Sequence, residues 1–500
     1  MSEESSDSVV RRDRFSGGPA RGFLSSLAAD ERIFEADLAV DRAHVVMLAE
    51  CDVIDDETAG DILSALDAIE VEGHGNLPDG EDVHEAIETA VIETVGPDGG
   101  RMHTARSRND EVATCIRYRL REDVLATLEA TLTLRETLAD VAAEHTETTM
   151  PGYTHLQPAQ PVTVGHWALS YEQAVRRDTE RLLEAYDRIN VSPLGAAAFG
   201  GTTFDINRER TAALLGFDGG VASRTSDTSS GLRSDGVLEN SMDAASSRDF
   251  LLETVQALST LATTLSGLAE DVILFANRGF VVLSDDYSST SSIMPQKKNP
   301  DTLELVRAVA GDAAGGVQGL TTTLKGLPRA YNRDLQRATP HAWSTVDAVL
   351  EATNVAAGAV GTADWNEAAL AAEAGAGFST ATGVADLLAA NGVPFRTAHE
   401  LVALAAERGG DAAAIEAAAG EVLAEPLEAY VDGETLETAL DPDHSVASRD
   451  SVGGPAPEAV HAQIESAAAA LEADTDAVDE RVSGLEAAHD ALRTAVMAYV

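Results

Sequence analysis

The sequence predicts an all-α protein whose centre is a bundle of very long helices. Apolar residues recur three or four positions apart over long segments in the middle of the chain, as they do along one face of an α-helix, and convincing strands are few. Isolated helices of this kind are marginally stable, so they must pack on one another. We therefore expect three helical domains, and a central bundle that forms a multi-subunit helical core.

The first domain is expected to span residues 1–108. A helical pattern runs from Ser25 to Asp67, whereas the stretches 72–82 and 97–110 are rich in glycine or proline and read as irregular connections. The second of these connections is also basic.

The central domain, expected at residues 109–360, begins with a stripe whose members are Ile116, Leu120, Val124, Thr127, Thr131, Leu134, Leu138 and Val141. A second helix is expected from Val162 to Asn190, and its 29 residues would span about 43 Å at about 1.5 Å per residue. Further long segments are expected from about Val237 to Asn277, from Leu303 to Leu324, and from Trp343 onward.

Residues 361–500 are rich in alanine, and their apolar pattern has a shorter period. They are predicted to form a separate, small C-terminal helical domain.

The net charge is −49, from 35 basic and 84 acidic residues spread along the whole chain. Such a field repels nucleic acid and anionic membranes, so neither is expected as a partner. The hydrophobic content of 44% and the long periodic segments argue against a disordered acidic chain. We interpret the acidity as an adaptation to concentrated salt, because at about 1 M salt the screening length falls to about 3 Å. An extreme halophile is therefore expected.

The sequence lacks the common targeting and metal-binding signals. No apolar run is long enough to span a membrane, and the N-terminal stretch MSEESSDSVVRRDRF lacks the apolar core of a signal peptide. The two cysteines, Cys51 and Cys115, form no CxxC pair, and HExxH, P-loop and GxGxxG motifs are absent from the sequence. A cytoplasmic protein without a metal or nucleotide cofactor is expected.

The stretch SSTSSIMPQKKNPDTLE, residues 288–304, differs from the chain around it. The chain has only three lysines, and two of them, Lys297 and Lys298, stand here side by side. Asn299 is a good N-cap, and Pro300 suits the first position of a helix. The two ammonium groups would thus lie beside a helix N-terminus that favours anions, and the preceding Ser/Thr run reads as a mobile loop.

This stretch resembles the signature loop of the fumarase, aspartase and argininosuccinate lyase superfamily, and its MPQKKNPD resembles the argininosuccinate lyase family in particular. Further stretches resemble the same family in the same order. They are EDVH (81–84), HTARSRNDEVAT (103–114), PGYTHLQPAQPV (151–162), SPLGAAAFGGT (192–202), NSMDAASSRDF (240–250), LPRAYNRDLQ (327–336) and GGPAPEAV (453–460).

The resemblance implies cleavage of argininosuccinate to arginine and fumarate by β-elimination, without a cofactor. A base removes a proton next to a carboxylate, so cations and N–H donors must face the charge that develops there. Lys297 and Asn299 are the expected carboxylate contacts, and Ser291 is the expected base. The family usually writes Gly-Ser-Ser here, and this chain has Thr290 in the glycine position.

The resemblance also assigns roles to residues outside the loop. His155 would be held by Glu304, which fixes the tautomer of the imidazole. The leaving group would receive its proton from His155 or from a water that His155 holds, with Thr154 nearby. Arg106, Arg108 and Asn109 would bind substrate carboxylates. The guanidinium groups of the two arginines can form paired hydrogen bonds with a carboxylate.

Tyr331 and Gln336 match the family's remaining substrate contacts. Two positions depart from the family pattern. The family's lysine after the glutamine is Thr339 here, with Arg337 as a candidate replacement, and a serine of the N-terminal arm aligns near Gly18.

Because these motifs are scattered along much of the chain, we expect a homotetramer in which different subunits complete each site. Two alternatives stay open from the sequence. One is another fumarate-producing lyase of the superfamily, of the fumarase or aspartase kind, and the other is a catalytically silent, crystallin-like structural homologue.

Overall fold

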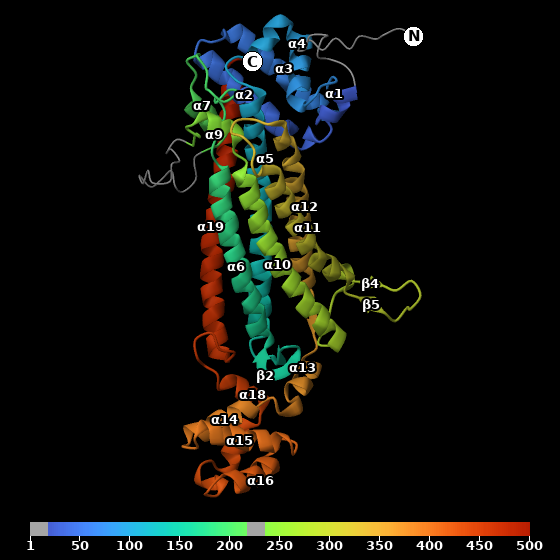
Figure 1. The fold of residues 1–500 in the computed structure, drawn as a ribbon, viewed down its shortest axis with the longest axis vertical. Helices are drawn as coiled ribbons and strands as arrows, with labels where there is room; N and C mark the ends of the chain where they lie inside the picture. The colour runs from blue at the N-terminus through green and yellow to red at the C-terminus, as the bar shows by residue number, and fades with distance from the viewer. Residues whose placement is uncertain (1–18, 218–235) are drawn as a thin grey trace.

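The computed structural model describes residues 19–217 and 236–500, and the all-α prediction is confirmed. The molecule is elongated, with a long bundle between two clusters of shorter helices (Figure 1). The bundle contains six long helices, which are α5 (Arg108–Glu144), α6 (Val164–Ile189), α10 (Asp249–Arg278), α11 (Asp301–Leu324), α12 (Thr339–Gly361) and α19 (Pro457–Val496).

The upper cluster in Figure 1 is formed mainly by the N-terminal part of the chain. Its helices are α1 (Pro19–Leu24), α2 (Phe34–Glu50), α3 (Asp56–Glu72), α4 (Val83–Val95), α7 (Arg208–Leu214) and α9 (Ser241–Ser246), with 3-10 turns at Asp30–Ile33, His74–Asn76 and Pro97–His103. The predicted helix over 25–67 is divided in two. Asp55 caps the second half by accepting a hydrogen bond from the N–H of Thr58, which explains where α3 begins.

The lower cluster consists of short helices. They are α13 (Glu367–Ala374), α14 (Ala381–Ala390), α15 (Phe395–Ala406), α16 (Ala412–Val422), α17 (Gly433–Ala439) and α18 (Pro442–Ala447), with 3-10 turns at Ala376–Phe378 and Leu427–Ala429. Of these, α14 to α17 pack around their own apolar core, while α13 and α18 contact the hairpin at residues 149–163. Residues 457–496, which the sequence pattern assigned to this domain, instead form α19 and run back along α5 and α6. Leu492 and Val496 then join the core of the upper cluster.

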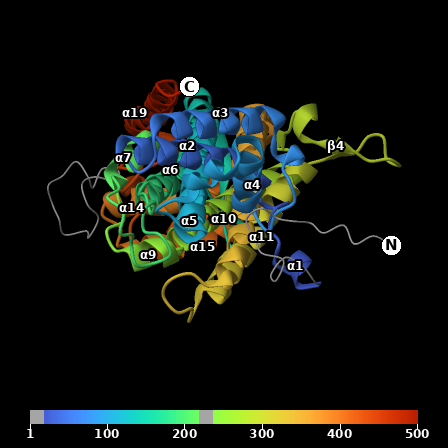
Figure 2. The same cartoon turned by 90° about the horizontal axis from the view of Figure 1, so that it is seen from above.

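The bundle is held by one continuous apolar core. Seen along its axis, α5 lies inside the bundle (Figure 2), in contact with α6, α12 and α19. By length and mean hydropathy α10 is apolar enough to cross a membrane. It packs against α6, α11 and α12, however, as the core helix of a bundle does, so this is weak evidence for a membrane.

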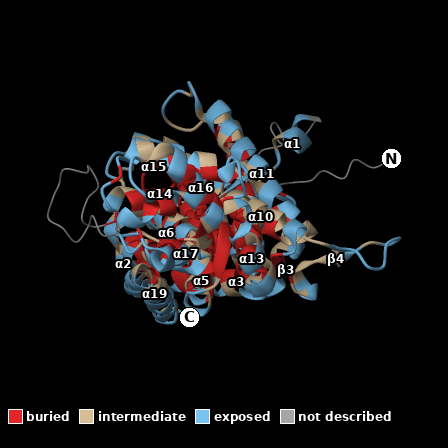
Figure 3. Cartoon of the chain, turned by 90° about the horizontal axis from the view of Figure 1, so that it is seen from below, coloured by how far each residue is buried: buried red, intermediate tan, exposed pale blue. Residues whose placement is uncertain are grey.

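Within the described residues, three small antiparallel sheets interrupt the helices. The largest is the hairpin of β1 (Thr149–Thr154) and β2 (Gln157–Thr163), which lies at the lower end of the bundle and occupies part of the segment predicted as helix. The others pair β3 (Val281–Val282) with β6 (Asp364–Trp365), and β4 (Ser289–Thr290) with β5 (Lys298–Asn299). Two more 3-10 turns lie at Asp285–Tyr287 and Arg333–Arg337. The segment that joins β4 to β5 projects away from the bundle and is exposed (Figure 3).

Candidate active site

A cavity of about 280 Å³ lies where the upper cluster meets the bundle. Four of the predicted substrate-binding residues line it, namely Arg108, Asn109, Tyr331 and Gln336. Thr339, which stands where the family has a lysine, also lines the cavity, whereas Arg337 is exposed and does not. The structure thus brings together residues from segments that lie far apart in the chain.

The start of α5 explains how two of these residues reach the cavity. Ser107 is the N-cap, and Asp110 completes a capping box by accepting a hydrogen bond from the backbone N–H of Ser107. Arg108 and Asn109 therefore occupy the first turn, where helix N–H groups favour anions. The Arg108 guanidinium lies 3.4 Å from a carboxylate oxygen of Asp82.

Arg106, also predicted to bind substrate, points away from the cavity. Its side chain is 1% exposed and pairs with Asp41 at 2.5 Å and with Glu111 at 3.0 Å. The structure therefore gives Arg106 a supporting position behind the cavity. The reason is the pair of buried carboxylates, Asp41 on α2 and Glu111 on α5, which hold its guanidinium inside the fold.

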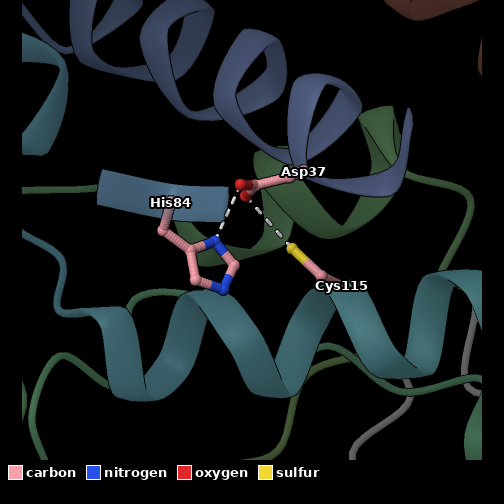
Figure 4. A group of neighbouring side chains, drawn as sticks. All are labelled: Asp37, His84 and Cys115. Atoms are coloured by element: carbon pink, nitrogen blue, oxygen red, sulfur yellow. Dashed lines mark hydrogen bonds and ion pairs between the residues drawn. The ribbon is translucent and has the colours of Figure 1, made fainter. Parts of the chain in front are cut away.

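Arg106 belongs to a buried ionic cluster on α2, α4 and α5. His84 donates from Nδ1 to Asp37 at 2.8 Å, and Cys115 donates its thiol proton to the same carboxylate (Figure 4). Burial alone would lower the pKa of His84, but the charges of Asp37 and Glu111 raise it to about 10. His84 is consequently an imidazolium at neutral pH, and it lines the cavity.

Among the described residues, two groups have a spacing that would suit a metal ion, and both belong to this cluster. One is Asp37 with His84 and Cys115, and the other is Asp37 with Asp41 and Glu111. In both groups protein cations and hydrogen bonds already engage the ligand atoms. The charged His84 has no lone pair free on Nδ1 for a metal. This donor set therefore fits an internal ion-pair network better than a metal centre.

Sequence reasoning missed several cavity residues. Ser26 and Asp30 line the cavity and are joined by a hydrogen bond of 2.7 Å from Oγ to Oδ2. The predicted arm position near Gly18 lies outside the described residues. Arg248 also lines the cavity, and burial lowers the pKa of its guanidinium to about 10. The signal for Arg248 is its place in the stretch NSMDAASSRDF, which resembles the family.

The cavity floor is fixed by contacts between distant segments. Gln336 donates from Nε2 to the carbonyl oxygen of Leu24 at 3.1 Å, and Arg333 pairs with Glu81 at 2.6 Å. Burial raises the pKa of the Tyr331 hydroxyl, so this phenol stays protonated at neutral pH. The cavity thus offers cationic groups, carboxylates and neutral hydroxyl donors together.

Thr154 and His155 lie at the tip of the β1–β2 hairpin, far from this cavity. His155 and Leu156 form a two-residue turn in which both have left-handed backbones, with φ of 56° and 58°. Bulky residues rarely adopt this conformation, and such strain clusters at functional sites. The His155 side chain is exposed, and the hairpin that carries it lies at the lower end of the bundle (Figure 1).

Ser291 lies in the projecting segment between β4 and β5. Its Oγ accepts hydrogen bonds from the backbone N–H groups of Ile293 at 3.3 Å and Met294 at 3.0 Å. Donors aimed at a hydroxyl oxygen stabilise its deprotonated form, which is what a serine base needs. This geometry favours Ser291 over Ser292.

The two neighbouring lysines differ in their contacts. Lys298 pairs with Asp285 at 2.7 Å across the base of the segment, which fits a structural role, while Lys297 lies exposed beyond it. Asn299 does not cap the next helix as expected. It pairs with Ser289 in the β4–β5 ladder, and Pro300 is the N-cap of α11. Glu304 follows on the first turn of α11 and is exposed.

Within one chain these groups lie at separate places. α5 has 37 residues and therefore spans about 55 Å at about 1.5 Å per residue. It begins with Arg108 at the cavity and ends just before the hairpin that carries His155. One chain alone consequently does not bring Arg108 and His155 together.

Similarity to known proteins extends over nearly the whole chain. A family profile described as Lyase matches residues 22–315, and one described as Argininosuccinate lyase C-terminal matches residues 378–447. An argininosuccinate lyase of Natronomonas pharaonis is 67% identical over 98% of this chain and 97% of its own length. The chain belongs to the argininosuccinate lyase family.

Other members of the argininosuccinate lyase family agree with this placement. The argininosuccinate lyase of Haloarcula marismortui is 62% identical over 100% of this chain and 98% of its own length. Both relatives come from halophilic archaea, as the acidic composition predicts. Among solved structures, EDDS lyase in complex with formate has a TM-score of 0.83 and 31% identity, covering 96% of each chain. A class II fumarase of Schistosoma mansoni shares the fold alone, with a TM-score of 0.68 and 18% identity over 83% of this chain and 90% of its own.

Proposed function

We propose that this chain is an argininosuccinate lyase, which cleaves argininosuccinate to arginine and fumarate in the last step of arginine synthesis. The observation that carries the proposal is the 67% identity to a relative of that name over nearly the full length of both chains. The alternatives of a fumarase- or aspartase-like enzyme and of a silent structural homologue are not favoured, because full-length relatives at 62–67% identity are named argininosuccinate lyase.

The chemistry of the described residues supports this reaction. Ser291 is the base that removes the proton next to a carboxylate, and the two N–H donors at its Oγ stabilise the alkoxide. Lys297 and Asn299 face the second charge that develops on the carboxylate. His155, held by Glu304, directs protonation of the departing guanidino group. None of these steps requires a metal or a cofactor.

The cavity at the start of α5 binds the remainder of the substrate. Arginine carries an ammonium group and a carboxylate at its far end, and the cavity offers charges of both signs. Asp30 and Asp82 suit the ammonium group, while Arg108 and Arg248 suit carboxylates. Tyr331 and Gln336 add neutral hydrogen bonds to the same region.

We further propose a homotetramer in the cytoplasm, in which surfaces from different subunits complete each site. Two observations support this assembly. The length of α5, about 55 Å, separates Arg108 from His155. In addition, most of α11 is uncovered within one chain, since Leu305 is 71% exposed and the only buried residues among its 24 are Leu303, Val306, Ala313, Gly316 and Leu320. A second copy that covers α11 would bury this face and supply the missing groups.

The decisive experiment measures fumarate release in concentrated salt with argininosuccinate, and separately with malate and with aspartate. We expect turnover with argininosuccinate alone. Turnover of malate or aspartate instead would replace the proposal with the fumarase- or aspartase-like alternative. Light scattering under the same conditions tests the assembly, since a fully active monomer is incompatible with shared sites.

A further inference from the structure

Asp110, the third residue of α5, is fully buried and engages two parts of the chain at once. One carboxylate oxygen accepts a hydrogen bond from the N–H of Ser107 at 2.8 Å. The other accepts from the N–H groups of Gly195 at 2.9 Å and Ala197 at 2.8 Å. The first bond caps the helix, whereas the other two hold a segment much further along the chain.

That segment has an unusual backbone. Gly195 and Ala197 both adopt left-handed conformations, with φ of 83° and 51°. A Cβ at position 195 would lie 2.6 Å from the side chain of Arg208, so only glycine fits there. Ala197 carries a Cβ, which disfavours its conformation unless neighbouring groups hold it. The bond from its own N–H to Asp110 is such a constraint.

The held segment touches the cavity through Asn109. The Asn109 side chain donates from Nδ2 to the carbonyl oxygen of Ala198 at 3.2 Å. Two adjacent residues of α5 therefore bind the same turn: Asp110 accepts from the N–H of Ala197, and Asn109 donates to the carbonyl oxygen of Ala198. Burial raises the pKa of Asp110 to about 6, so the carboxylate is charged at pH 7 and accepts all three bonds.

We propose that Asp110 is a positioning residue for substrate binding, because it holds Ala197 in its left-handed conformation and thereby fixes the direction of the Asn109 side chain. This inference rests on the proposed function, in which Asn109 binds a substrate carboxylate. A simple helix cap would need only the bond to Ser107. The two bonds to the distant segment are what this role requires in addition.

The first test is Asp110→Asn, which keeps the shape but turns one acceptor into an N–H donor that faces N–H groups. We expect KM for argininosuccinate to rise by about tenfold, as loss of a charged hydrogen bond predicts, with kcat changed much less. In the double variant Asp110→Asn with Ala197→Gly, KM should return most of the way to the wild-type value. Glycine adopts the left-handed conformation without support.

Two further variants isolate the cause. Ala197→Val changes the residue that donates the bond and leaves Asp110 intact. Because a β-branched residue disfavours a positive φ, this variant should also raise KM. It also decides the matter if Asp110→Asn does not fold. Asp411→Ala removes a helix cap, the bond from the Ala414 N–H to Asp411 at 2.8 Å, remote from the cavity. It should lower stability and leave KM unchanged.

Amide hydrogen exchange of residues 193–201, measured on the full chain in concentrated salt, reports how firmly this segment is held and does not depend on enzyme activity. Exchange should be faster in Asp110→Asn and slow again in the double variant. An unchanged KM in Asp110→Asn, or a raised KM that Ala197→Gly fails to restore, would overturn the proposal. A wild-type protein that releases no fumarate would refute the proposed function, and exchange of the segment would still show whether Asp110 holds it.

Discussion

Around the cavity, charged groups from distant elements hold one another in place. Arg333 pairs with Glu81, and the buried Arg106 pairs with Asp41 and Glu111, which come from two different helices. Most of these contacts join parts of the chain that are far apart in sequence. The shape of the cavity is therefore fixed by the fold itself, as a largely preformed site requires.

The segment that carries Ser291 is held differently. Two contacts hold the end of this segment nearest the bundle. Lys298 pairs with Asp285, and the hydroxyl of Thr302 donates to the carbonyl oxygen of Tyr287 at 2.6 Å. Its tip is open to solvent, with Ile293 84% exposed. In the proposed mechanism, the cavity is therefore held in place by the fold, whereas the proposed base, Ser291, lies on an exposed segment that would have to close over the substrate.

The largest expected effect separates these two regions. Ser291→Ala should lower kcat by about 10³-fold or more, because the base is lost, and should leave substrate affinity nearly unchanged. Steady-state kinetics and equilibrium binding of argininosuccinate in concentrated salt check this. Ser292→Ala is the matched control and should retain most activity. A large loss of affinity in Ser291→Ala would mean that the segment also forms the binding site.

A smaller effect is expected at the adjacent lysines. Lys297→Arg keeps the charge but replaces a compact ammonium group with a wide planar fork, so kcat should fall by about 10²-fold with a smaller change in KM. Lys298→Arg should cost only a few-fold, since an arginine can still pair with Asp285. Kinetics of both variants decide between them, and the reverse order of damage would exchange their roles.

The last effect concerns stability and its pH dependence at the cavity end, and not activity. The pKa of His84 is about 10 in the folded protein and 6.5 in a free histidine, so folding binds a proton between these values. Its stabilising contribution is complete below about pH 6.5 and is lost as the pH rises toward 10, by up to about 1.4 kcal/mol per pH unit.

Thermal unfolding between pH 7 and 10 measures this slope. The Tm of the wild type should fall across that range, and the Tm of His84→Gln should fall less steeply, because glutamine does not titrate. Activity of the projecting segment plays no part in this readout. Equal slopes in the two proteins would remove His84 as the cause.

The bundle could be predicted because its helices carry regular apolar stripes. The stripe of α5 needs no knowledge of its partners, and all of its predicted members, from Ile116 to Val141, are buried. α19 could not be placed in the same way. Its buried residues, such as Val460, Ala467 and Val478, are small and widely spaced among acidic ones, so they become a recognisable stripe only beside α5.

The site shows a similar division. Residues inside long motifs, such as Arg108 and Gln336, were selected from the sequence and do line the cavity. Arg106 stands only two positions before Arg108, and its direction depends on Asp41, which lies on α2, much earlier in the chain. Ser26 reaches the cavity by folding of the N-terminal arm, for which a short and weakly patterned segment gives no local signal.

The length of α5 has a consequence for how this protein can change. One residue inserted in the middle of a helix moves everything beyond it by about 1.5 Å and turns it by about 100°. The 37 residues of α5 thus set the distance and the relative rotation between the cavity and the hairpin. Insertions in surface loops leave this spacing unchanged, whereas an insertion in α5 would change both the distance and the relative rotation between its two ends.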